Sequence, residues 1–339
     1  MRHLAIVATL CAAVFALLVL PSTIRADKAE FVIKFGTVAP DGTPWADQLR
    51  SIKKRVESES KGRIKMKLFL GGTLGGEVEM VRALRRGRIQ GWGGSTAALA
   101  EGASLDPLLV FELPFFFRSF EEADYIADKV VKDDFVTLLN KNGFVFGHWN
   151  ENGWRNFGTT KPAHTLADLR TMKMRSQEAP THLAMYQALG VQAESIPVPE
   201  VLGALKTSMV DGFDNTPLFS SATGWYEGIK HYTISRHIYQ PAIIVYSKKF
   251  VDELPPDLQK ILIGDPDKES VEARKNVRAM ATPLMQNFKE AGITVYELTP
   301  AERKPFEDAC AKVPDQFEKK IGKKLLDKVK AALAEIRKK

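Results

Sequence analysis

Two arginines in apolar surroundings are the residues of this chain best suited to binding an anion. Arg155 lies between Trp154 and Phe157 in the segment NGWRNFG. Arg175 ends the segment MKMR, directly after an alternating apolar pattern. An arginine that leaves a buried strand must find an anion or hydrogen-bond acceptors, because its unpaired burial is costly. The partner of each arginine could be a bound ligand or an internal Asp or Glu, and the residue types leave both open.

A third polar segment is VDGFDNTP at residues 210–217, which is typical of a turn from a helix to a strand. Asp214 and Asn215 lie in this turn, where both side chains could face a cleft. Carboxylate and amide groups bind polar ligands through hydrogen bonds. Both residues are therefore candidates for a binding site.

The sequence lacks the usual signatures of catalysis. It has no P-loop, HExxH, CxxC or GxSxG motif, and its scattered histidines show no metal-ligand spacing. The glycine-rich loop at residues 71–76 lacks the dinucleotide-binding spacing. The nearest match to a nucleophile elbow is GGSTA at residues 93–97, where alanine replaces the final glycine. A secreted serine hydrolase using Ser95 is thus an alternative, but we expect no enzyme, no metal and no other cofactor.

Alternating strand and helix patterns predict an α/β fold. Apolar residues alternate over residues 31–36 and again over 63–70, as in half-buried strands. Between these strands, Thr43 and Pro44 form a typical helix start, and Gly62 is expected to end the helix. The chain therefore opens with a strand, a helix and a second strand.

Two longer helical patterns follow in the second half of the chain. Residues from Asp265 to about Ala291 predict one long helix, and Pro283 inside it predicts a kink. From Gln316 onward, apolar residues recur at four-residue steps as far as Leu333. That face could lie on a membrane surface, but packing of the helix on its own domain is much commoner.

The start of the chain predicts export. A basic residue, Arg2, precedes an uncharged apolar run over residues 4–20 and a small residue at Ala26, the pattern of a signal peptide over residues 1–26. The alternative is an uncleaved anchor helix, for which the run is slightly short. Once the leader is removed, Cys310 is the only cysteine, so no internal disulfide can form. The net charge of the whole chain, +7, is too small to indicate a nucleic-acid partner.

Four segments together resemble a known family. They are KGRIKMKLFLGGTLGGEVEMVRALRRG (61–87), FELPFFFRS (111–119), TLADLRTMKMRS (165–176) and ALGVQAESIPVPEVLGALKTSMVDGFDNTP (188–217). The chain resembles the DctP-type substrate-binding receptors of tripartite ATP-independent periplasmic (TRAP) transporters. The resemblance covers essentially the whole mature chain, and the segments are specific only in combination.

The resemblance implies a two-lobed periplasmic-binding-protein fold with an interdomain cleft and a long kinked connecting helix. Lobe I would hold residues 29–152 and 241–280, and lobe II residues 153–240 and 281–339. The lobes would close on a small carboxylate in the periplasm and deliver it to the membrane subunits of a TRAP transporter. An ion gradient would drive uptake, so the chain should bind no nucleotide.

The resemblance also implies roles for the polar residues described above. In such receptors, the arginine at the position of Arg175 forms a bidentate salt bridge with the carboxylate of the ligand. A guanidinium fork matches a carboxylate in geometry and charge. A second arginine, at the position of Arg155, assists in binding the carboxylate of the ligand. An asparagine at the position of Asn215 also contacts this carboxylate. Asp214 is not followed by the tryptophan found in metal-bridged relatives, so no metal is expected.

Departures from the sialic-acid-binding members indicate a less polar pocket. Several polar or aromatic pocket positions of those members hold other residues in this chain: Val38, Ser95, Ala98 and Val198. Glu77 retains an acidic pocket position, and Trp45 and Trp92 could be either pocket walls or ordinary core. We expect a smaller or more apolar carboxylate than a sugar acid. The alternative is a carrier for a lipid or another apolar ligand whose head group Arg175 would hold.

Overall fold

The computed structural model describes residues 29–338. The predicted signal peptide and its cleavage point after Ala26 lie outside these residues. Within residues 29–338, no helix combines the length and the apolar character needed to cross a membrane.

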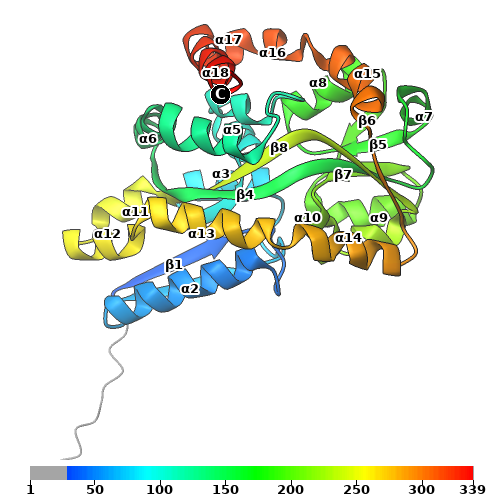
Figure 1. The fold of residues 1–339 in the computed structure, drawn as a ribbon. Coiled ribbons are helices and arrows are strands. Elements are labelled where there is room, and N and C mark those ends of the chain that lie inside the picture. Colours follow the sequence, from blue (N-terminus) through cyan, green and yellow to red (C-terminus); the bar gives the residue numbers. More distant parts are fainter. Residues whose placement is uncertain (1–28, 339) are drawn as a thin grey trace, which may run out of the picture.

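One mixed sheet of nine strands organises the fold (Figure 1). Its strands are β1 (Phe31–Gly36), β2 (Ile64–Phe69), β3 (Gly91–Ser95), β4 (Phe144–Thr159), β5 (Lys173–Ser176), β6 (Gln192–Ser195), β7 (Gly212–Asn215), β8 (His231–Ser247) and β9 (Thr294–Glu297). The strand order is β2-β1-β3-β8-β4-β7-β5-β6, and β9 pairs with β8. The predicted α/β class is confirmed.

The long strands β4 and β8 join the two halves of this sheet. They pair antiparallel from Phe144 opposite Ser247 to Thr159 opposite His231. At one end of the pair, β8 also binds β3, so we call β1, β2, β3 and their helices the β1–β3 half. At the other end, β4 also binds β7, so we call β5, β6, β7 and their helices the β5–β7 half. Both halves are therefore attached to the same two strands.

Helices cover both halves of the sheet. The longer helices and the helical turns are α2 (Pro44–Glu59), α3 (Glu77–Arg85), α4 (Thr96–Ala103), η1 (Asp106–Glu112), α5 (Phe120–Tyr125), η2 (Ile126–Val130), α6 (Lys132–Lys141), α7 (Leu166–Arg170), α8 (Pro180–Leu189), η3 (Val198–Glu200), α9 (Val201–Lys206), α10 (Pro217–Ala222), η4 (Trp225–Gly228), α11 (Lys248–Glu253) and α12 (Pro256–Ile263). The predicted start of α2 is confirmed: the Thr43 side chain accepts a hydrogen bond from the N–H of Ala46, and Pro44 begins the helix.

The predicted long helix is divided in two by its kink. Helix α13 covers Pro266–Arg278 and α14 covers Ala281–Glu290, and Figure 1 shows them in succession across the front of the molecule. The break lies three to four residues before Pro283. A proline ring clashes with the carbonyl group four residues earlier, which here belongs to Ala279. Helix α13 packs on β4, whereas α14 packs on α10 and β9, so the pair runs from one half to the other.

The C-terminal segment also reaches both halves. It contains α15 (Pro300–Cys310), α16 (Val313–Gln316), α17 (Glu318–Ile321) and α18 (Lys323–Ile336). Helices α15 and α16 pack on α8, whereas α17 packs on η1 and α18 on η2. Leu326, Val329 and Leu333 are buried, so the amphipathic face of α18 packs on the protein. The lobe boundaries proposed from the sequence remain a prediction.

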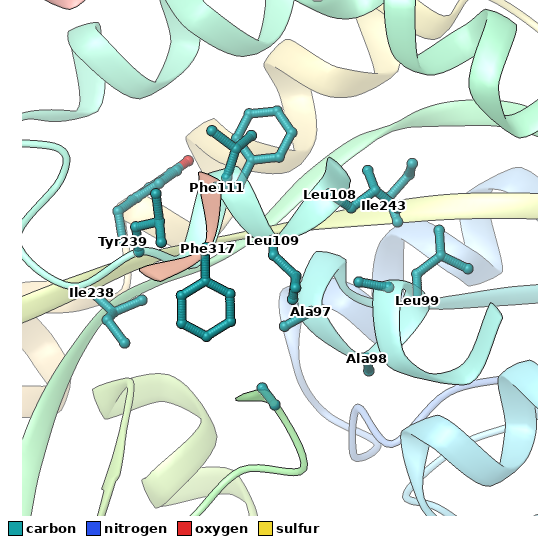
Figure 2. Packing of buried hydrophobic residues seen from close by; sticks show 14 of the residues in the cluster. Ala97, Ala98, Leu99, Leu108, Leu109, Phe111, Ile238, Tyr239, Ile243 and Phe317 are labelled. Atoms are coloured by element: carbon teal, nitrogen blue, oxygen red, sulfur yellow. The ribbon is translucent and has the colours of Figure 1, made fainter. Parts of the chain in front are cut away.

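The largest hydrophobic cluster connects these layers. Figure 2 shows Phe317 of the C-terminal segment among residues of η1 and β8, including Leu109 and Ile238. A second cluster lies around β1 and α2, and a third around β7, α9 and η4. Each half therefore has a core of its own, and the first cluster extends between them.

Candidate functional site

A small cavity lies between the two halves, beside the middle of β4 and β8. It encloses a volume of about 30 Å³. Its lining residues are Thr37, Val38, Ala39, Trp45, Glu77, Gly94, Asn152, Arg155, Arg175, Gln177, Val198, Asn215, Phe219 and Gln240. Of the predicted site residues, the cavity brings together Arg155, Arg175, Asn215, Glu77, Trp45, Val38 and Val198.

Arg155, on β4, is balanced by a carboxylate of the protein. Its Nε donates to Asp214 Oδ2 at 2.6 Å, and Nη2 donates to the Asp214 carbonyl oxygen. Its Nη1 lies within 3.2 Å of the side-chain oxygens of Gln177, Asn215 and Gln240. Both Arg155 and Asp214 are buried. The internal salt bridge, one of the two possibilities that the sequence left open, is therefore formed at Arg155.

Asp214, at the end of β7, lies behind the cavity and does not line it. Its Oδ1 accepts a hydrogen bond from the Tyr186 hydroxyl at 3.0 Å, and Nε2 of His237 lies 3.3 Å from Oδ2. Although burial opposes ionisation, the Arg155 guanidinium and the hydrogen bond with His237 hold the pKa of Asp214 well below its usual value. Asp214 is thus ionised and holds Arg155 in place through their salt bridge.

Arg175, at the end of β5, has no matching carboxylate. Its Nε donates to the carbonyl oxygen of Ile196 at 2.9 Å, and its guanidinium carbon lies 5.1 Å from the ring centroid of Trp225. Within residues 29–338, Arg175 forms no ion pair, and its two terminal nitrogens have no protein acceptor. Burial and the neighbouring Arg155 lower the pKa of Arg175 to about 10. Arg175 is therefore a buried cation without a direct ion-pair partner, although the charges of Asp214 and Glu77 partly offset the lowering of its pKa.

The local strand geometry directs Arg175 to the cavity. Met174 and Arg175 are successive residues of β5, so their side chains point to opposite faces of the sheet. Met174 enters the core, and Arg175 lines the cavity. Strand β5 pairs in parallel with β7, where Arg175 lies opposite Phe213. The carboxyl ends of these two strands bring Arg175 and Asn215 to the same edge.

Asn215 is oriented so that its amide N–H groups are available. Its Oδ1 accepts hydrogen bonds from Arg155 Nη1 at 3.2 Å and from the N–H of Thr216 at 2.8 Å. Its Nδ2 has no acceptor in the described part of the chain. Arg155 thus fixes the amide by its oxygen and leaves its two donors for the cavity that Asn215 lines.

Glu77, the first residue of α3, supplies an acidic group to the same cavity. Its Oε1 accepts the backbone N–H of Ser95 at 2.8 Å, and its Oε2 accepts the Ser95 hydroxyl at 3.2 Å. Burial, reinforced by the neighbouring Glu112, raises the pKa of Glu77 to about 7, against the opposing hydrogen bonds from Ser95. Glu77 can therefore be present in both protonation states near neutral pH.

Two further predicted site residues, Ser95 and Trp92, are not among the residues that line this cavity. The Ser95 hydroxyl is fully buried, where it bonds Glu77 and accepts hydrogen bonds from Gln177 Nε2 at 2.8 Å and from the N–H of Ala98 at 3.3 Å. No histidine from residue 29 to residue 338 is bonded to it. The Ser95–His pair of a serine hydrolase is therefore not formed within residues 29–338, and the Ser95 hydroxyl is bonded to the Glu77 carboxyl group instead. Trp92 belongs to the largest hydrophobic cluster, so it is core.

Apolar side chains form the walls of the cavity. Val38, Val198 and Phe219 contribute apolar surface. Trp45, from α2, also lines the cavity, and its indole N–H donates to the carbonyl oxygen of Glu151 at 3.0 Å. The polar groups are thus few and fixed against an apolar wall, as is usual in a small-molecule site.

Three amide side chains of the cavity were not predicted from the sequence. Gln240 Nε2 donates to Gln177 Oε1 at 2.8 Å, and Asn152 Nδ2 donates to Gln240 Oε1 at 3.1 Å. For Gln177 a signal existed, because it follows Arg175 by two residues and so lies on the same side of an extended segment. Gln240 and Asn152 become neighbours only through the pairing of β4 with β8.

Comparison with known proteins agrees with this architecture. Residues 35–320 match the family model DctP, described as bacterial extracellular solute-binding protein, family 7. The chain belongs to this family. Among family relatives, it is 31% identical over 270 residues to the 2,3-diketo-L-gulonate-binding periplasmic protein YiaO of Escherichia coli, covering 78% of this chain and 80% of that one. It is 28% identical to the C4-dicarboxylate-binding periplasmic protein DctP of Rhodobacter capsulatus, covering 90% and 91%.

Solved structures of solute-binding proteins share the fold. The sugar acid binding protein DctPAm from Advenella mimigardefordensis, in complex with galactonate, superposes with a TM-score of 0.85 at 27% identity, covering 90% of this chain and 98% of that one. The two-lobed receptor fold predicted for this DctP-family protein is thereby confirmed, and so is the predicted family.

Proposed function

We propose that this DctP-family protein is a periplasmic solute receptor that captures an organic carboxylate and delivers it to the membrane subunits of a TRAP transporter. The observation that carries the proposal is the buried guanidinium of Arg175, which lines the cavity between the two halves and has no protein acceptor for its two terminal nitrogens within residues 29–338. The ligands named for the relatives, a diketo sugar acid, C4-dicarboxylates and galactonate, are all carboxylates.

A ligand carboxylate would supply what Arg175 lacks. Taking an unpaired charge out of water costs several kcal/mol or more, whereas a carboxylate on a guanidinium fork restores both charge balance and hydrogen bonds. With Nε held by Ile196, the two terminal nitrogens remain for the ligand. The free amide N–H groups of Asn215 add donors to the same anion. Arg155 then acts mainly by holding Asn215 in position.

Closure of the two lobes around the ligand is the expected mechanism. We propose lobes of residues 29–152 with 241–280 and of residues 153–240 with 281–339, the last segment also contacting the first lobe. Arg175 and Asn215 would belong to the second lobe, and Glu77 and Trp45 to the first. A ligand that contacts both sets stabilises the closed form only, and so shifts the population toward it.

The lining of the cavity favours a small polar acid. Arg175, Asn215 and Glu77 gather polar and charged groups there, which disfavours the lipid carrier considered from the sequence. Val38 and Val198 contribute apolar surface where sugar-acid receptors of the sialic-acid type use polar or aromatic groups. We therefore propose an acid smaller than a sialic acid, bound after export and removal of residues 1–26, without a metal or another cofactor.

A thermal-shift screen of the purified protein tests this function. Each of a set of mono-, di- and keto acids is compared with its neutral amide, which has nearly the same shape without the charge. We expect at least one acid to raise Tm in a concentration-dependent manner and its amide to have no effect. Equal shifts with acid and amide, or no shift with any acid, would overturn carboxylate capture.

A further inference from the structure

We propose that the protein has a second binding site, which takes a small apolar amine. The site is a cavity at the break between α13 and α14, which we call the helix-break cavity, and its volume is about 200 Å³. Of the described residues, its lining shares only Asn152 with the lining of the Arg175 cavity. The inference goes beyond carboxylate capture and does not depend on it.

Apolar side chains form most of the walls of the helix-break cavity. Helix α13 contributes Val277, and α14 contributes Leu284 and Met285. Three further elements, α5, β4 and α10, add Phe120, Trp154 and Leu218. A closed apolar cavity of about 150 Å³ can bind benzene. The helix-break cavity therefore has room for a ring with a short side chain.

One buried carboxylate oxygen beside this cavity lacks a hydrogen-bond donor. Glu151, a lining residue on β4, is fully buried, and its Oε2 accepts hydrogen bonds from the Tyr239 hydroxyl at 2.8 Å and from Nε and Nη2 of Arg278 at 2.9 and 2.6 Å. Its Oε1 has no partner within residues 29–338. A Cβ placed on Gly153, another lining residue, would be 4.0 Å from this oxygen. Because a buried acceptor without a donor is costly, a donor on a ligand would be stabilised there.

The charged groups around Glu151 leave a negative charge without a full counter-charge. Arg278 forms two further hydrogen bonds with Asp124, at 2.8 and 2.7 Å, so Glu151 and Asp124 share one arginine. Arg274 pairs with Asp128 at 2.7 Å and also lies 3.3 Å from Asp124. Two arginines therefore face three carboxylates. Burial raises the pKa of Glu151, against the opposing hydrogen bond and charge of Arg278.

The other charged groups near the cavity do not restore the balance. Arg236, which also lines the cavity, pairs with Glu297 at 2.7 Å. Its side chain is exposed, so the cavity opens to solvent beside it and a ligand can enter there. Glu121, whose carboxylate also interacts with Arg278, adds negative charge. An ammonium group on a ligand would supply both the missing donor for Oε1 of Glu151 and the missing positive charge.

Three probes that share a ring and differ in one end group test this site: benzylammonium, benzyl alcohol and toluene. Binding is followed by NMR on the isotope-labelled methyl group of Met285, which lines the cavity and whose signal is assigned by its loss in Met285→Leu. We expect benzylammonium to shift this signal and to bind about tenfold or more tighter than toluene, with benzyl alcohol between them. Equal affinities for the three probes, or no shift with any of them, would overturn the inference. Because no probe carries a carboxylate, either result leaves carboxylate capture intact.

Two tryptophan substitutions on α14 test where the amine binds. Ala281→Trp adds a large ring to the lining and should weaken benzylammonium binding at least about tenfold, because it takes up the space of the probe. Thr282→Trp is the matched control, since Thr282 is an exposed neighbour outside the lining, and it should bind like the wild type. Wild-type affinity in Ala281→Trp would show that the amine binds elsewhere and would overturn the site.

The variant Glu151→Gln tests the acceptor. A glutamine that keeps the hydrogen bonds of Arg278 and Tyr239 through its oxygen places an N–H donor where Oε1 now lies. We expect this variant to lose most of the preference for benzylammonium over toluene while toluene binds as before. An unchanged preference would contradict the role of Glu151 and overturn the amine as the ligand class.

Discussion

Single residues decide how charge is distributed around the cavity. Arg155 and Arg175 are equally buried, yet one is paired with Asp214 and the other faces the cavity. The first therefore has a structural role, and we propose the second as the cation that binds the ligand. The two require different experiments, because loss of the first should unfold the protein and loss of the second should abolish binding.

Replacement of the Asp214 carboxylate tests the structural role. Asp214→Asn leaves the Arg155 charge buried without its partner, which should lower the free energy of unfolding by about 3–5 kcal/mol. Urea denaturation measures the loss. Asp252→Asn is the control, because Asp252 pairs with Lys248 on the surface, and removing that pair should cost at most about 1 kcal/mol. Equal losses in the two variants would show that Arg155 does not depend on Asp214.

The titration of Glu77 predicts a dependence of stability on pH. Its pKa of about 7 in the folded protein lies above the value of 4.5 expected when it is unfolded. The folded state therefore holds the proton more tightly, so this contribution is complete below pH 4.5 and is lost as pH rises to about 7. Glu112 and Arg175 are the charged groups that act on it.

Comparison with Glu77→Gln isolates this contribution. Between pH 4.5 and 7, the wild type should lose stability relative to the variant, by up to about 1.4 kcal/mol for each pH unit. Chemical denaturation at several pH values measures the difference. A difference that stays constant over this range, or that changes in the opposite direction, would contradict the assigned titration.

Sequence reasoning identified both arginines but not which of them is paired. Asp214 lies 59 residues after Arg155 in the chain, and the two meet because β4 pairs with β7. Sequence reasoning likewise could not tell which of two tryptophans lines the cavity. Trp45 and Trp92 have similar local patterns, and only the tertiary packing places the first in the cavity and the second in the core.

At the scale of elements, the close packing of α3 on β3 determines where Glu77 lies. A Cβ placed on Gly94 would be 2.4 Å from Glu77 Oε1 and 2.5 Å from Cζ2 of Trp92. Glycine is thus needed at this position of β3 so that the carboxyl group can sit against the strand. The first turn of α3 and strand β3 together determine the position of the Glu77 carboxyl group.

Substitution of Gly94 tests this contact. Gly94→Ala should destabilise the protein by about 1–3 kcal/mol through overpacking, and should also weaken ligand binding by displacing Glu77. Gly203→Ala is the control, because a Cβ there meets nothing within 4 Å, and it should be neutral or stabilise α9 by up to about 1 kcal/mol. Thermal unfolding of both variants gives the comparison. Similar Tm values for the two would contradict the close approach.

Elements were predicted well where local chemistry dominates. The capped start of α2 and the alternation of β1 and β2 were evident in the sequence because caps and side-chain periodicity are local. The division into α13 and α14 was predicted only as a kink. Its position at Ala279 and Met280, ahead of Pro283, follows from the clash of a proline with the preceding turn.

For the whole molecule, the essential feature is that two long strands and a broken helix connect two halves, with the cavity that holds Arg175 between them. Binding of a ligand that touches both halves should favour a compact form. Small-angle X-ray scattering should therefore give a smaller radius of gyration with the acid than without it. Addition of the same acid to Arg175→Ala should leave the radius unchanged. An unchanged radius for the wild type at saturation would contradict closure by the ligand.

The lobe boundaries cannot be obtained from sequence alone, because the C-terminal segment contacts both halves. Helix α15 packs on α8, whereas Arg337, just after α18, donates to both carboxylate oxygens of Glu122 at 2.8 and 2.9 Å. Amphipathic periodicity predicted that α18 is a helix, but it carries no information about which half the helix covers.

The most direct measurement of the central claim is a calorimetric titration of Arg175→Ala with an acid that binds the wild type. Loss of the guanidinium should weaken binding by at least about a hundredfold, corresponding to roughly 3 kcal/mol, as for a buried charge pair that loses one partner. Lys173→Ala is the matched control, because Lys173 lies on the same strand and pairs at the surface with Glu194. We expect the control to bind the acid like the wild type. An Arg175→Ala protein that is folded and binds the acid as tightly as the wild type would contradict the claim.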